Sequence, residues 1–254
     1  MNSVMTNLDS RHRSRRAASK LEGQQALRKC EDCPVRQLSV CSSLNREECL
    51  ALAATGVTVK LSGRSELFRE GDVVEGVYNV TAGLLRTFRI LPDGRRSVIG
   101  FVLPGDFIDT SLCERHDFCA DAAGETVVCS FDRRAFWNFV AQRPSFMREI
   151  HESCLRQLAL AHDQIALGAS GNAGQKLACF LVGLQRRWGR LGGPSAFVPL
   201  PMTRQDIGDF LNLSIWTVSR KLAEFARDRR ILLVPGGVRI LPSSGLEQAM
   251  AGGD

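Results

Sequence analysis

The stretch MTRQDIGDFLNLSIWTVSRKLAEFARDRRIL, residues 202–232, decides the fold of the C-terminal part of the chain. Thr203 is followed three residues later by Asp206, and this capping box predicts that a helix begins directly after Thr203. Residues 212–213 form a predicted tight turn, and Ser214 is a favourable N-cap for a second helix. Two short helices joined by a tight turn are typical of the helix-turn-helix motif.

The second predicted helix has one apolar face and one polar, basic face. Val218, Leu222 and Phe225 recur at helical spacing, so we expect them to be buried. The outward positions are Trp216, Ser219, Arg220 and Arg227. From Asn172 onward the chain has eleven Lys and Arg against six Asp and Glu, which is most of its net charge of +6. A basic end segment favours a nucleic acid as partner.

Residues 231–242, ILLVPGGVRILP, alternate around a Pro-Gly-Gly turn and predict a β-hairpin, the wing of a winged helix-turn-helix. Such a domain places its second helix in the major groove of double-stranded DNA and holds phosphates with backbone amides and basic side chains. The residues expected to contact DNA are Thr203, Arg204, Ser214, Trp216, Thr217, Ser219 and Arg220. Arg220 is the best candidate for a contact with guanine.

Residues 61–131 contain several short runs of alternating apolar residues, each ending near glycine or Pro-Gly. Asp93-Gly94 separates two of these runs and is a strong hairpin signal. Regular spacing of about 8–12 residues between turn signals predicts an all-β barrel or sandwich.

A long helix is predicted over residues 145–168, where there is no Pro or Gly before position 168. Its apolar positions follow one another by three or four residues, as in a coiled-coil seam that pairs with a second copy. The alternative is a helix packed on its own domain. The predicted seam is Met147, Ile150, Cys154, Leu158, Ala161 and Ile165, with Asp163 beside it.

The chain therefore divides into four predicted parts, and residues 168–174, GASGNAG, are expected to form a flexible hinge between the last two. The parts are a flexible basic tail over residues 1–29, a cysteine-rich segment and β domain over 30–144, a dimerisation helix over 145–168 and a DNA-binding domain over 169–254.

Three thiols lie close together in the segment CEDCPVRQLSVC, at Cys30, Cys33 and Cys41. The chain has no secretory signal and no apolar run of the ~20 residues that a membrane helix needs, so we expect a cytoplasmic protein without membrane contact. Disulfides are rare in that reducing compartment, and clustered cysteines there indicate metal or redox chemistry. Zinc is the second choice of metal, because a second CxxC pair is missing. Core positions in apolar helices are expected for Cys49, Cys154 and Cys179.

The segments LFREGD, VYNVTAGLLRTF, VIGFVLPGDFI and MTRQDIGDFLNLSIWTVSR resemble the CRP/FNR family of bacterial transcription regulators over nearly the whole chain. The resemblance implies an α+β fold with a β-roll (jelly-roll-like) sensor domain, a long dimerisation helix and a winged helix-turn-helix domain. It implies a homodimer on palindromic double-stranded DNA, with RNA polymerase as an expected further partner.

The resemblance also bears on the ligand. The cyclic-AMP branch of the family carries Gly-Glu where this chain has Asp109-Thr110, and Arg-Ser-Ala where it has residues 118–122, FCADA. A buried phosphate needs that arginine as its bidentate partner, so we expect that the protein binds no cyclic nucleotide.

The cysteine spacing is similar to that of the FnrN-type members of the FNR branch, which bind an oxygen-labile [4Fe–4S] cluster. That resemblance implies ligands at Cys30, Cys33, Cys41 and Cys129, the last in the strand ETVVCSF. Thiolates are soft ligands that suit iron–sulfur clusters. Cys113 and Cys119 are the alternatives for the fourth ligand.

One position departs from the FNR pattern, since Trp216 stands where a glutamate is usual in the recognition helix. Tryptophan cannot accept from a cytosine amino group, although its ring can contact a thymine methyl group. The main hypothesis is an oxygen-responsive regulator in which the cluster favours the dimer. Asp163 would separate cluster-free protomers by charge repulsion. The alternatives are a FixK-like regulator without a cluster and a metal-containing enzyme, for which no catalytic constellation is present.

Overall fold

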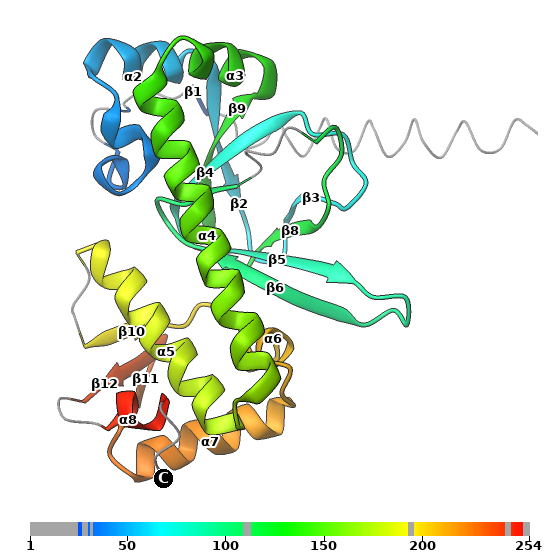
Figure 1. The fold of residues 1–254 in the computed structure, drawn as a ribbon, viewed down its shortest axis with the longest axis vertical. Helices are drawn as coiled ribbons and strands as arrows, with labels where there is room; N and C mark the ends of the chain where they lie inside the picture. Colours follow the sequence, from blue (N-terminus) through cyan, green and yellow to red (C-terminus); the bar gives the residue numbers. More distant parts are fainter. Residues whose placement is uncertain are drawn as a thin grey trace, which may run out of the picture.

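A computed structural model shows the predicted α+β architecture, in which two β-sheets, one long helix and a small helical domain follow one another along the chain (Figure 1). The residues that the structure describes are 25–26, 30, 33–108, 113–192, 196–241 and 245–250. Most of the predicted tail lies outside them, but Gln25–Ala26 forms a short strand that pairs with the next one. No helix among the described residues is long and apolar enough to cross a membrane.

The N-terminal domain is the predicted β-roll. Its helices are η2 (Arg36–Leu38), η3 (Val40–Ser43), α2 (Arg46–Ala53) and α3 (Arg133–Ala141). Its strands are β1 (Gln25–Ala26), β2 (Gly56–Leu61), β3 (Glu66–Phe68), β4 (Gly76–Ala82), β5 (Leu85–Ile90), β6 (Arg96–Val102), β7 (Phe107–Ile108), β8 (Cys119–Ala122) and β9 (Thr126–Asp132). They form two antiparallel sheets, in the orders β1-β2-β9-β4-β7 and β3-β8-β5-β6.

Buried side chains of both sheets fill the space between them. Val80, Ile108 and Val128 of the first sheet pack with Leu85 and Ala120 of the second. Alternating residues point inward because successive side chains of a strand project to opposite faces. The predicted turn after Asp93 joins β5 to β6, and Gly94 adopts φ +80°, a value that glycine accepts without strain.

The long helix α4 spans Pro144–Ser170 and runs beside both domains (Figure 1). Phe146 and Ile150 are buried in the core of the N-terminal domain, at 0% and 4% exposure. Ile150 was predicted to lie in the dimer seam, whereas the structure buries it in the core of its own domain. Its side chain packs inside its own domain, because α4 contacts η3 and α3 there.

The C-terminal domain begins at α5 (Ala173–Arg190), so only residues 171–172 separate it from α4. Its other elements are β10 (Phe197–Pro199), α6 (Arg204–Leu211), α7 (Ile215–Arg227), β11 (Ile231–Val234), β12 (Gly237–Ile240) and α8 (Leu246–Met250). The strands form one sheet in the order β10-β12-β11, and β11 and β12 are the predicted wing. Leu177, Leu181 and Val218 of this domain share one hydrophobic cluster with Val98 and Phe101 of β6. The two domains are therefore packed together.

Candidate functional site

The structure places the cysteine-rich segment against the face of the first sheet that points away from the second sheet. Cys30 and Cys41 pack against a hydrophobic cluster that contains Cys129 of β9 and Cys49 of α2. Cys33 is half-buried, and its backbone N–H donates to the carbonyl of Cys30 at 3.4 Å. The three N-terminal thiols thus lie beside the strand that carries the predicted fourth ligand. We call these four residues the thiol group.

Electrostatics also show that the thiols are neighbours. Burial, followed by the nearby thiols of Cys49 and Cys33, raises the pKa of Cys30 to about 11. Burial raises the pKa of Cys41 to about 12. Burial, with added effects of Cys33, Cys30 and Cys41, holds the pKa of Cys129 well above that of an ordinary thiol. All four predicted ligands therefore interact with one another, and Cys49 is close to two of them.

Two polar atoms near the thiol group fit a bound group with sulfur atoms. Nε of Arg36 and Oδ1 of Asn79 are both buried without a hydrogen-bond partner in the part of the chain that the structure describes. Arg36 lies in η2, between Cys33 and Cys41. Asn79 lies on β4 and pairs in register with Cys129. A cluster would bring a sulfur acceptor to Nε of Arg36 and, once the amide of Asn79 is turned by half a turn, to its NH₂ group; hydrogen bonds to sulfur are common around iron–sulfur sites.

Among the described residues, no group of three or more Cys, His, Asp or Glu side chains is close enough together to hold one metal ion. The thiols of a single zinc ion all lie at about 2.3 Å from it, and so gather around one point. A [4Fe–4S] cluster binds each of its four cysteines at a different iron, which spaces the thiols more widely.

The remaining cysteines lie elsewhere. Cys113 is exposed, and Cys119 belongs to the second sheet, where its sulfur accepts the backbone N–H of Glu70 at 3.3 Å. Cys49 is buried as predicted, and Cys179 is half-buried on α5. The core position predicted for Cys154 was wrong, because that side of α4 is exposed.

The helix-turn-helix has the predicted geometry. The hydroxyl of Thr203 caps α6 by accepting a hydrogen bond from the backbone N–H of Asp206. The carboxylate of Asp206 in turn accepts a hydrogen bond from the backbone N–H of Thr203. The turn contains Asn212 at φ 54°, a left-handed conformation that asparagine tolerates. A Cβ atom at Gly208 would lie 2.6 Å from the carbonyl oxygen of Leu213, so only glycine lets the turn approach α6 this closely.

The outer surface of α7 carries the predicted DNA contacts. Trp216 is 81% exposed, and Arg220 is exposed one helical turn further on. Arg204 of α6 donates from Nη1 to the hydroxyl oxygen of Ser219 at 3.3 Å, which braces α7 against the start of α6. The two other predicted contacts near the turn have a structural role as well, since the hydroxyl of Ser214 accepts the backbone N–H of Thr217 at 3.0 Å.

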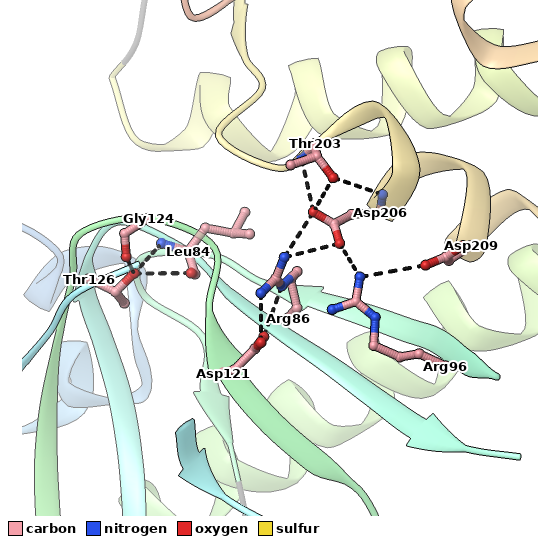
Figure 2. Close-up of polar contacts among 9 residues, drawn as sticks. All are labelled: Leu84, Arg86, Arg96, Asp121, Gly124, Thr126, Thr203, Asp206 and Asp209. Atoms are coloured by element: carbon pink, nitrogen blue, oxygen red, sulfur yellow. Dashed lines mark hydrogen bonds and ion pairs between the residues drawn. The ribbon is translucent and has the colours of Figure 1, made fainter. Parts of the chain in front are cut away.

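A buried network of ion pairs joins the sensor domain to α6, and sequence reasoning missed it (Figure 2). Arg86 of β5 makes a bidentate contact with Asp121 of β8, at 2.8 and 2.6 Å, and pairs with Asp206 at 2.9 Å. Arg96 of β6 binds Asp206 and lies 3.5 Å from Asp209. We call these five residues the interdomain network. Its only signal in the sequence was an arginine in the middle of an apolar strand.

A second set of polar contacts between the two domains lies nearby. Arg187 of α5 donates from Nη2 to the carbonyl oxygen of Phe101 at 3.0 Å and to Asp106 at 2.5 Å. The first helices of the C-terminal domain are therefore anchored to the sensor sheet through both α5 and α6, and the orientation of α7 depends on these contacts.

Comparisons with known proteins agree with this arrangement. Residues 58–143 match the model of the cyclic nucleotide-binding domain, and residues 175–249 match that of the Crp-like helix-turn-helix domain. The chain is 41% identical to the nitrogen fixation regulation protein FixK of Bradyrhizobium diazoefficiens, over 87% of this chain and 94% of that protein. It is also 41% identical to the transcriptional activatory protein AadR of Rhodopseudomonas palustris, over 84% of this chain and 90% of that protein.

The structure of FixK2 from Bradyrhizobium japonicum superimposes with a TM-score of 0.71 at 26% sequence identity, covering 76% of this chain and 96% of FixK2. The β-roll, the long helix and the winged helix-turn-helix thus occur in one chain in the same order. With these matches, the chain belongs to the CRP/FNR family of DNA-binding transcription regulators.

Proposed function

We propose that the protein is an oxygen-responsive transcription regulator whose signal is read by a [4Fe–4S] cluster bound to Cys30, Cys33, Cys41 and Cys129. The observation that carries the proposal is the position of the cysteine segment, which packs Cys30 and Cys41 against the hydrophobic cluster containing Cys129. The proposal explains why three cysteines that are close in the sequence lie beside a fourth cysteine on a distant strand. The cluster would supply an oxidisable centre, with nitric oxide as a second possible signal.

The thiol group is placed to act on the dimerisation helix. η3 contains Cys41 and packs directly against α4. Phe146 and Ile150 of α4 belong to the same hydrophobic cluster as Cys129. A ligand can shift a conformational equilibrium only by binding one state better than the other. Because the thiol group and α4 share these contacts, the cluster would bind better to one arrangement of α4 than to another.

The outer face of α4 supports pairing with a second copy of the chain. Leu155 and Leu158 are each 50% exposed, and Ile165 is 69% exposed. The inner face is polar over the same stretch, where Gln157 donates to the carbonyl oxygen of Phe107 at 2.9 Å. Apolar residues face outward and amides face inward, an arrangement that favours a partner over the outer face. We infer a homodimer through Met147, Cys154, Leu158, Ala161 and Ile165.

Asp163 is exposed on α4, but it stands two residues from both Ala161 and Ile165, which turns it to the other side of the helix, and its charge acts on the thiol of Cys179 in α5. The carboxylate therefore lies away from the inferred seam, and the proposed pairing rests on the apolar residues. Dimerisation would space the two recognition helices one turn of DNA apart, matched to a palindromic site. Arg220 would contact guanine and Trp216 a thymine methyl group. RNA polymerase is an inferred partner, and we propose no enzymatic activity.

We infer that the protein is not controlled by a cyclic nucleotide. Phe118 and the small residues Ala120 and Ala122 occupy the segment where a phosphate-binding arginine would be needed. The other position, Asp109-Thr110, lies outside the described residues.

A second candidate is a FixK-like regulator without a cluster, controlled by its expression or by cysteine oxidation. The similarity to FixK at 41% identity favours it. The thiol group argues for the first candidate, because control by expression alone needs no group of four interacting cysteines.

Anaerobic purification separates the two candidates. We expect a coloured protein containing iron and sulfide, which dimerises and binds DNA, and which loses its colour, its dimers and its DNA affinity in air. A colourless protein without iron that binds DNA equally well with and without air would refute the cluster and favour the FixK-like alternative.

A further inference from the structure

Two polar atoms at the thiol group are buried without a partner among the described residues, and the fold does not explain either of them. The first is Nε of Arg36. The guanidinium is held in place by Nη2, which donates to the carbonyl oxygen of Leu44 at 2.6 Å. The Nε–H of Arg36 stays buried without an acceptor among the described residues, which costs free energy, and the charge of the side chain acts on the thiol of Cys30.

The second is Oδ1 of Asn79, a residue that is only 2% exposed. Asn79 pairs in register with Cys129 on one side and with Phe107 on the other. Directly opposed residues of antiparallel strands project to the same face, with Cβ atoms about 4.5–5.5 Å apart. The amide of Asn79 therefore lies beside the thiol of Cys129. An apolar residue would fill this position at lower cost.

We propose that Arg36 and Asn79 donate hydrogen bonds to sulfur atoms of the bound cluster and so slow its oxidation. The inference rests on the proposed function. Arg36 lies on the loop side of the thiol group and Asn79 on the sheet side, so the two donors would hold the cluster from opposite directions. A half-turn about its last side-chain bond exchanges the oxygen of Asn79 for its NH₂ group, and the two ends have nearly the same shape.

The direction of the effect follows from charge. Four thiolates give the bound cluster a net negative charge, and oxidation transfers one electron from it to dioxygen. The cationic side chain of Arg36 and the N–H donors stabilise the more negative, reduced form. Removing either residue therefore makes loss of the electron easier. The four ligands remain, so uptake of iron should not change.

The test uses the full-length variants Arg36→Gln and Asn79→Leu, with Gln37→Ala as control, because Gln37 is the exposed neighbour of Arg36. Each protein is reconstituted anaerobically with iron and sulfide. We expect equal iron content in all, and loss of the visible absorption in air on the order of tenfold faster in the two variants than in wild type. Gln37→Ala should match wild type, and Arg36→Lys should restore part of the lifetime.

The cluster-free proteins give a separate measurement. Since leucine removes an unsatisfied buried amide, the thermal midpoint of cluster-free Asn79→Leu should not fall below that of wild type. A lower midpoint would make Asn79 a structural residue and overturn its role. Iron-loaded variants that decay no faster than Gln37→Ala would overturn the inference and leave the proposed function intact. A wild-type protein that takes up no iron would instead refute the proposed function, and the inference with it.

Discussion

Arg86 of β5 and Asp206 of α6 form a buried ion pair across the two domains, with side chains only 5% and 1% exposed. Asp206 also closes the capping box at the start of α6 through Thr203 (Figure 2). One carboxylate therefore starts the first helix of the helix-turn-helix and docks that helix onto the sensor sheet. This pair joins the sensor to the DNA-binding domain together with the shared hydrophobic cluster and the contacts of Arg187.

Replacing Arg86 by methionine should destabilise the protein strongly. The substitution leaves Asp121 and Asp206 buried without their shared cation, and removal of one partner from a buried pair costs about 3–5 kcal/mol. Urea denaturation measures this loss. Arg89→Met is the matched control on the same strand, because the pair of Arg89 with Glu70 is exposed and solvent screening leaves it little effect on stability. Equal losses in the two variants would show that the buried pair does not carry the stability.

Asp206 should also make stability depend on pH under acidic conditions. Burial alone would raise its pKa, but hydrogen bonds from Thr203 and the charge of Arg86 outweigh burial and lower the pKa below its ordinary value of 3.8. The folded state then binds the proton less readily than the unfolded state. The contribution of Asp206 is therefore complete above the ordinary pKa and is lost as the pH falls through the folded value.

Unfolding free energies measured between about pH 5 and pH 2.5 should show this loss. The variant Asp206→Asn cannot titrate, so its stability should fall less steeply over the same range. Parallel curves for wild type and Asp206→Asn would assign the acid sensitivity to other carboxylates.

Local signals predicted much of the C-terminal domain from sequence. The cap at Thr203, the turn at Asn212 and the glycine at position 208 act within a few residues, so each could be recognised from the chain alone. The hairpin at Gly94 and the wing are local in the same sense. Local geometry depends on neighbouring residues, and these are visible in the sequence.

The docking of the two domains could not be predicted in this way. Arg86 and Asp206 are separated by 120 residues, and each has an adequate local explanation as a polar strand residue or as a cap. Ile150 had the correct spacing for the dimer seam, but spacing does not tell which side of α4 meets its own domain. The proposed role of Arg36 and Asn79 likewise could not be predicted, because only the fold brings the thiols beside them.

Cys129→Ala should abolish cluster retention, because it removes the one proposed ligand that comes from the sheet. Cys179→Ala is the control, since this half-buried cysteine lies on α5 in the other domain. Iron and sulfide content and the visible spectrum, measured after anaerobic reconstitution, give the result. Loss of iron in the Cys179 variant with retention in the Cys129 variant would refute the ligand assignment.

Leu158→Glu should weaken the dimer. Two glutamates would replace an apolar contact in the inferred seam, where their like charges would repel each other. Val73→Glu is a suitable control, because Val73 is similarly exposed at 57% but lies outside α4. Analytical ultracentrifugation of the anaerobic proteins should show monomers for Leu158→Glu and dimers for Val73→Glu. A dimer unaffected by Leu158→Glu would place the interface on another surface.

Arg220→Ala should relax sequence recognition at one base pair of each half-site. Arg220 is exposed on α7, where a bidentate contact with a guanine would contribute about 1–3 kcal/mol of discrimination. Arg227→Ala is the control at the far end of the same helix, and we expect it to weaken binding to all sequences about equally, as loss of a phosphate contact does. Binding measured against a library of single-base variants of a selected site separates the two effects. If Arg220→Ala lowers affinity uniformly and leaves the preferred sequence unchanged, the residue contacts the backbone, and base recognition must come from Trp216 and its neighbours.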